Sequence, residues 1–184
     1  MTLSFIYLLT ACVIADAQNG KPVIFTTQSN LAIARFKSGE TDKIPVRGRA
    51  AFTLTEANDD DTLKGTVAFT IPDDGRKKLA QISGKDLGAV PTNYLKKDVI
   101  AIFRKGTACP IAHIVIPTTE LNASGIKLQL DRVEIEISEN QQPITQLLCA
   151  WTRQINANRQ RRGIIAAINR LITGWPEESS SPRP

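Results

Sequence analysis

The feature that most constrains the fold is a strict alternation of apolar and other side chains over residues 63–71. The apolar side of this segment consists of Leu63, Gly65, Val67, Phe69 and Ile71. Successive side chains of a β-strand point to opposite faces, so the pattern predicts a strand with one buried face and one face in water. Residues 44–56 alternate in the same way, and residues 57–61 between them are rich in Asn and Asp, which favour turns. The sequence therefore predicts an antiparallel hairpin over residues 44–71.

Four further segments have the composition of strands. Residues 23–27 are rich in β-branched and aromatic side chains, and residues 31–36 form a second apolar run. Residues 99–103 and 111–116 are apolar on both faces. Runs of this kind are typical of central strands, so we expect both to be covered on each side.

One more strand is expected over residues 126–137, where the apolar phase changes at Asp131-Arg132. A change of phase of this kind predicts a β-bulge. Before the central strands, residues 72–75 are expected to form a turn, and residues 77–82 one or two turns of helix.

From residue 144 the apolar spacing changes to three and four, which predicts amphipathic helix. The first set is Ile144, Leu147, Leu148, Trp151 and Ile155, and the second is Ile164, Ile165, Ile168, Leu171, Ile172 and Trp175. The step from Ile144 to Ile164 rotates about 200° at 3.6 residues per turn, so one straight helix would present the two sets on opposite sides. We therefore predict a break near residues 158–163.

These elements predict an α+β fold: an antiparallel β-sheet of about six strands, curved or sandwich-like, followed by one or two C-terminal amphipathic helices. The 184 residues suit one domain. We expect a single β-rich domain with C-terminal helices over residues 18–175 and a disordered Ser/Pro-rich tail over residues 176–184.

The chain begins with an apolar segment over residues 3–14 that is followed by Ala15-Asp16-Ala17. The segment is too short to cross a membrane, and the small residues match a signal-peptidase site. We therefore predict a signal peptide over residues 1–17 and an exported protein, periplasmic or secreted. As an alternative, Leu9-Thr10-Ala11-Cys12 resembles the bacterial lipobox, in which a lipidated Cys12 would anchor the protein in the cell envelope.

Removal or lipidation of Cys12 leaves an even pair, Cys109 and Cys149. In an oxidising compartment the simplest expectation for such a pair is a disulfide. Two buried thiols are the alternative, because free Cys packs as a small apolar side chain.

No residue pattern identifies a catalytic, cofactor-binding or metal site. His113 is the single histidine and lies in an apolar run, so we expect a structural role for it. On a strand, Cys109 and His113 would lie about 13 Å apart, too far for a nucleophile pair. Residues 59–61 and 73–74 are acidic but lie at opposite ends of a predicted strand; solvated turns are expected there, with surface calcium at residues 59–61 as the alternative.

The sharpest basic cluster is Arg159, Arg161 and Arg162. We expect a solvated helix end, with the cations placed favourably near a helix C-terminus before Gly163. Contact with an anionic surface and proteolytic cleavage after Arg162 are alternatives. Few aromatic side chains flank the cluster, which disfavours nucleic acid as the partner.

The leading functional hypothesis is an exported, non-enzymatic binding or protein-interaction module without a cofactor. It would hold an apolar ligand between sheet and helices, or present a face to a partner protein. A membrane-surface lipoprotein or envelope-complex subunit is one alternative. A hydrolase with an unrecognised carboxylate site is the other, and a carboxylate near Tyr94 or Ser83 would support it.

Overall fold

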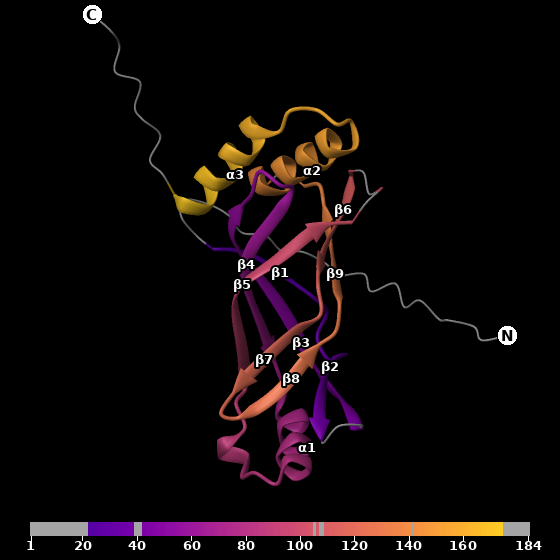
Figure 1. Ribbon diagram of the computed structural model, residues 1–184, viewed down its shortest axis with the longest axis vertical. Coiled ribbons are helices and arrows are strands. Elements are labelled where there is room, and N and C mark those ends of the chain that lie inside the picture. Colours follow the sequence, from indigo (N-terminus) through magenta and orange to yellow (C-terminus); the bar gives the residue numbers. More distant parts are fainter. Residues whose placement is uncertain (1–21, 39–41, 105, 107–108, 141, 175–184) are drawn as a thin grey trace, which may run out of the picture.

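The computed structural model describes residues 22–38, 42–104, 106, 109–140 and 142–174. The predicted signal peptide, Cys12 and the predicted tail lie outside the described residues. The fold is α+β: a curled antiparallel sheet that forms a half-barrel, followed by two C-terminal helices (Figure 1). The predicted fold class is confirmed.

The sheet has nine strands in the described part of the chain, in the order β7-β8-β2-β3-β4-β5-β6-β9, with β1 paired to β3. Every pairing is antiparallel. The strands are β1 Val23–Thr26, β2 Leu31–Ser38, β3 Asp42–Ala57, β4 Thr62–Thr70, β5 Asn93–Phe103, β6 Ile111–Ile116, β7 Thr119–Ala123, β8 Ile126–Leu130 and β9 Val133–Ser138.

The predicted hairpin is the β3–β4 pair, with Phe52 opposite Val67 and Ala50 opposite Phe69. The inner side chains of β4 are buried and the outer ones are half-buried, as the alternation indicates. Gly65 has a packing role here, because a Cβ at this position would lie 2.6 Å from the Phe52 ring and 2.4 Å from the Thr53 carbonyl oxygen. The missing side chain therefore lets the aromatic ring lie directly over the strand.

The prediction of one bulged strand over residues 126–137 is wrong. The segment forms two strands: β8 pairs with β2 and β7, and β9 pairs with β6. Thr119 faces Leu130 and Ile116 faces Val133, so the same register continues through the break and 111–138 is one long interrupted hairpin. The change of apolar phase marks the interruption, where the Asp131 N–H donates to the Ile33 carbonyl oxygen at 2.8 Å.

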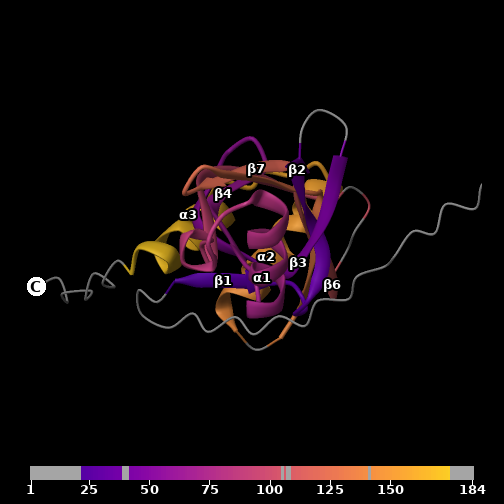
Figure 2. The same cartoon turned by 90° about the horizontal axis from the view of Figure 1, so that it is seen from below.

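This long hairpin explains how the sheet curls. Its first arm consists of β6 and β7, and β6 pairs with β5. Its second arm consists of β8 and β9, and β8 pairs with β2. It therefore bridges two strands that are separated by β3 and β4 in the strand order. Seen from below, the strands curve around the helix at the lower end (Figure 2).

Helices lie at the two ends of the half-barrel (Figure 1). α1 (Asp73–Ser83) and the short 3-10 helix η1 (Leu87–Ala89) lie at the lower end, where α1 contacts β2 and β3. The prediction of a turn over residues 72–75 is wrong, because α1 already begins at Asp73 and runs longer than expected.

The upper end carries α2 (Pro143–Asn156) and α3 (Arg162–Thr173), so the predicted break between two C-terminal helices is confirmed. α2 contacts β6 and α3, and α3 contacts β3. Both helices therefore pack on the sheet of their own chain.

Candidate functional site

The outer face of β5 differs from the sequence-based expectation of a strand covered on both sides. The inner residues Val99, Ala101 and Phe103 are buried. The outer residues Ile100 and Ile102 are 42% and 48% exposed. Two-sided burial is therefore wrong for β5: the sequence is apolar on both faces, but this chain covers only one of them.

Other exposed apolar side chains lie on the same outer face. Leu95 on β5 is 59% exposed, and Ile111 on β6 is 43% exposed. Ile102 lies opposite Val115, which shares a side of β6 with Ile111 but is itself buried (4% exposed). We call the set Leu95, Ile100, Ile102 and Ile111 the outer β5–β6 face.

Ion pairs flank the outer β5–β6 face on both sides. On the β4 side, Lys64 Nζ lies 3.0 Å from Asp98 Oδ1 and 4.0 Å from Glu56 Oε2. The hydrogen bond and the charge of Asp98 raise the pKa of Lys64, which keeps it cationic. Ile100 lies directly opposite Lys64, so the apolar residues and the charges are neighbours.

On the other side, the carboxylate of Glu134 on β9 forms ion pairs with two arginines. Arg104 lies 3.2 Å and Arg132 lies 2.9 Å from its carboxylate oxygens. Glu134 is also the strand partner of Val115. An apolar centre with charged groups around it is the usual anatomy of a protein–protein interface.

The interior of the half-barrel is filled by the chain's own side chains. The largest fully buried ones are Trp151, Tyr94, Phe25, Phe52 and Phe69. They come from β1, β3, β4, β5 and α2, so the space between sheet and helices is occupied by packed core.

The Tyr94 hydroxyl is buried and has no hydrogen-bond partner among the described residues. Burial raises its pKa to about 12, with the charge of Arg76 acting in the opposite direction. Arg76 itself donates to the carbonyl oxygens of Leu87 and Val90. Ser83 Oγ donates to the Ala80 carbonyl oxygen at 3.3 Å. In the described structure, neither Tyr94 nor Ser83 is hydrogen-bonded to a carboxylate.

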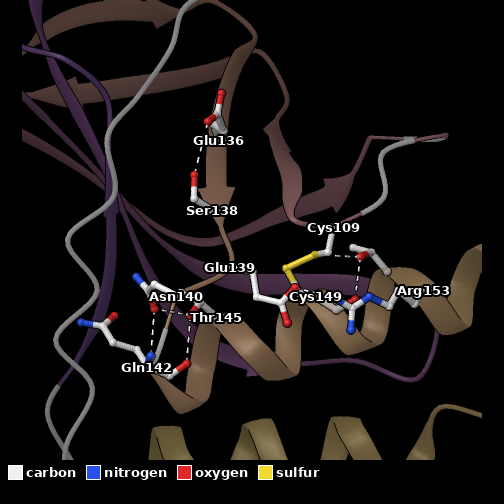
Figure 3. Close-up of a disulfide and its surroundings, with 10 residues drawn as sticks. Cys109, Glu136, Ser138, Glu139, Asn140, Gln142, Thr145, Cys149 and Arg153 are labelled. Carbon is white, nitrogen blue, oxygen red and sulfur yellow. Dashed lines mark hydrogen bonds and ion pairs between the residues drawn. A yellow bond between two sulfur atoms is a disulfide. The ribbon is translucent and has the colours of Figure 1, made fainter.

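The predicted Cys109–Cys149 disulfide is present and ties the segment before β6 to α2 (Figure 3). The two Cα atoms are 5.4 Å apart. Glu139 lies close by and pairs with Arg153. Ligand atoms of Cys109, Glu139 and Cys149 lie within 4.8 Å of one another, but the sulfur atoms are bonded together and the carboxylate has a cationic partner. These three residues therefore form a disulfide bond beside an ion pair.

The acidic loop between β3 and β4 is a contact point for the helices, which sequence reasoning missed. Asp61 Oδ1 accepts a hydrogen bond from Trp151 Nε1 at 3.2 Å and lies 2.9 Å from Arg161 Nε. Asn169 of α3 binds the backbone of Ala57 twice, at 2.7 and 2.9 Å. These partners are about 90 or more positions apart along the chain, so no local pattern could indicate them.

The three arginines of the predicted basic cluster have different surroundings in the fold. Arg161 is engaged with Asp61, whereas Arg159 and Arg162 are exposed. The expected favourable position near a helix C-terminus is wrong for Arg161 and Arg162, because they are the N-cap and the first residue of α3. Arg159 does follow the end of α2, where its N–H donates to the Gln154 carbonyl oxygen at 3.0 Å.

His113 lies half-buried on β6, opposite Glu136 of β9. Cys109, four positions earlier, is oxidised in the disulfide. The two residues therefore do not form a Cys–His nucleophile pair.

These observations describe an α+β half-barrel with an exposed apolar sheet face and a helical end. Comparison of the chain with models of known protein families, with curated proteins and with solved structures found no match. Among the described residues, no helix has the length and hydropathy needed to cross a membrane.

Proposed function

We propose that the chain is an exported protein-interaction module that binds a partner protein through the outer β5–β6 face. The observation that carries the proposal is the exposure of Ile100 and Ile102 on a strand that is apolar on both sides. Strands of this composition are normally covered on both faces. A partner protein would supply the cover that the chain itself lacks.

The filled interior favours this function over the carriage of an apolar ligand. Ligand pockets in small carriers are concave and need space between the elements that line them. Here Phe52 and Phe69 pack against backbone at Gly65 and Gly48, and Trp151 closes the upper end of the core. The apolar surface that a binding partner can reach is therefore on the outside of the sheet.

The charge of the chain indicates the kind of partner. The formal net charge is +5, and removal of residues 1–17 with Asp16 would give 23 − 17 = +6. A like net charge opposes pairing with a second copy of the chain. We therefore expect a different protein whose rim is acidic around an apolar centre.

The disulfide supports the export part of the proposal. Structural disulfides form and persist in oxidising compartments, which include the periplasm and the extracellular space. The Cys109–Cys149 bond is consistent with that environment.

Substitution of the apolar centre tests the proposal. Ile100→Thr with Ile102→Thr keeps β-branched side chains on β5 but removes apolar contact area. We expect the affinity for the partner isolated from the producing cells to fall at least tenfold, about 1.4 kcal/mol. Ile24→Thr on β1 is the control, because Ile24 is also an exposed isoleucine (37%) on the outer side of the sheet, but β3 and β4 lie between it and β5. Its affinity should stay within about twofold of the unsubstituted protein.

Two results would contradict the proposal. One is an unchanged affinity of the double variant for the isolated partner. The other is a homodimer in light scattering that the double variant dissociates, which would make a second copy the occupant of the face.

A further inference from the structure

The two C-terminal helices carry charge of a single sign. Residues 143–174 contain five arginines, no lysine and no acidic residue. Two of the five are neutralised by partners from the sheet side: Arg153 pairs with Glu139, and Arg161 pairs with Asp61. The remaining three are exposed and have no ion-pair partner among the described residues: Arg159, Arg162 and Arg170. The last two glutamates of the chain, Glu177 and Glu178, lie outside the described residues.

The exposed side of α3 carries arginines, and the other exposed side chains on it are small. Arg162 and Arg170 are eight residues apart, which places them about 80° apart around the helix and about 12 Å apart along it. The exposed residues between and after them are small or uncharged: Gly163, Ala166 and Thr173. Arg159 precedes them in the α2–α3 connection. We call Arg159, Arg162 and Arg170 the basic end.

Helix stability does not explain this placement. The N-terminus of a helix is its positive end, where a cation is unfavourable by roughly 0.3–1 kcal/mol. α3 begins at Arg162, has no acidic residue in its first turn and has no side-chain hydrogen bond at its N-cap. Asp61 compensates Arg161, but no described carboxylate compensates Arg162. An anionic ligand would supply the missing countercharge.

We infer that the basic end docks on a membrane surface that contains anionic phospholipid. Guanidinium groups bind phosphate oxygens with two donors at once, which suits lipid headgroups. Ile164 and Leu171 of α3, on the side of the helix next to Arg170, are half-buried and pack against the core. Apolar insertion and electrostatic attraction to anionic lipid both contribute to binding at a membrane interface, and the basic face offers the electrostatic contribution.

Single-stranded nucleic acid fits this surface less well. Stacking of bases requires exposed aromatic side chains, and Trp151, the aromatic residue of α2 and α3 in the described structure, is fully buried. The basic end is at the opposite end of the molecule from α1 (Figure 1), whereas β6 contacts α2. Membrane docking and partner binding use different residues, so separate substitutions can test them.

Sedimentation with lipid vesicles tests the inference on the protein recovered from the periplasm or medium. We expect binding to phosphatidylcholine vesicles that contain phosphatidylglycerol, none to phosphatidylcholine alone, and loss of binding in high salt. Arg159→Gln, Arg162→Gln and Arg170→Gln together should weaken binding on the order of 100-fold, since each basic residue near an anionic surface contributes roughly fivefold.

A charge-matched variant provides the control. Lys77→Gln and Lys78→Gln on α1 with Lys127→Gln on β8 also remove three positive charges, but not from the helical end. This variant should bind vesicles within a few-fold of the unsubstituted protein. Equal loss in the two triple variants would overturn the inference in favour of general charge attraction. Retention on immobilised heparin without vesicle binding would overturn it in favour of a soluble polyanion.

Discussion

At the residue scale, Tyr94 is a fully buried residue whose hydroxyl has no hydrogen-bond partner among the described residues. A buried hydroxyl that makes no hydrogen bond costs roughly 1–3 kcal/mol relative to water. Tyr94 therefore contributes to the core through its ring, while its hydroxyl lowers the free energy of unfolding.

Tyr94→Phe tests this account through the pH dependence of stability. In the native chain the pKa of Tyr94 is raised from 10.0 to about 12, so the unfolded state ionises first. The stabilising effect of the raised pKa is complete below pH 10 and declines as the pH rises from 10 to about 12. Tyr94→Phe should remove this decline, and at pH 7 it should leave the free energy of unfolding unchanged or raise it by about 1 kcal/mol.

Urea titrations at several pH values measure both effects. The chain has two tyrosines, and Tyr7 lies within the predicted signal peptide, so tyrosinate absorbance of the protein without residues 1–17 reports Tyr94 alone. A native-state titration near pH 10 would show that the hydroxyl is not buried, and a destabilisation of several kcal/mol in Tyr94→Phe would show that it has a partner.

At the element scale, the helical end is held to the sheet by three contacts between distant segments. They are the Cys109–Cys149 disulfide, the Asp61 contacts to Trp151 and Arg161, and the Asn169 hydrogen bonds to Ala57. Each joins a helix to a strand or to a loop beside one. The basic end is therefore displayed on a fixed support.

Removal of the disulfide should lower stability without changing the fold. The bond joins residues 40 positions apart, which corresponds to about 4 kcal/mol in the chain-entropy model. We expect Cys109→Ala with Cys149→Ala to lose about this much in urea unfolding, and reduction of the native protein to have the same effect. Alanine avoids burial of a new hydroxyl at Cys149. Two free thiols in the native protein, or equal midpoints before and after reduction, would contradict the prediction.

The elements that could be predicted from the sequence are those specified by local spacing. The β3–β4 hairpin follows from an uninterrupted alternation, and the division between α2 and α3 follows from the rotation between Ile144 and Ile164. The long hairpin 111–138 could not be predicted, because its partners β2 and β5 are chosen by the curl of the whole sheet. The disulfide could be predicted because only two cysteines remain after Cys12.

The sequence pattern indicated only part of the candidate site. The apolar outer residues of β5 are visible in the sequence, but a pattern cannot show whether the chain covers Ile100 and Ile102 or leaves them exposed. Similarly, the arginines are visible, but the pairing of Arg161 with Asp61 depends on a contact across 100 residues. The incorrect expectation for β5 is informative, because apolar composition without intramolecular cover is what a binding face requires.

At the scale of the whole molecule, two surfaces are left without a partner in the described chain. The outer β5–β6 face is apolar with charged flanks, and the basic end is cationic. They consist of different residues of one half-barrel, whose own interior is filled. We therefore regard the fold as a support that presents one surface to a protein and another to a membrane.

Crosslinking in the producing cells tests whether a partner protein covers the outer β5–β6 face. A photo-reactive amino acid would replace Ile102, and a matched sample would carry it at Ile24. We expect one discrete crosslinked protein at position 102 and none at position 24, with the adduct lost when Ile100→Thr is added. An identical pattern at both positions, or no adduct at position 102, would contradict this expectation.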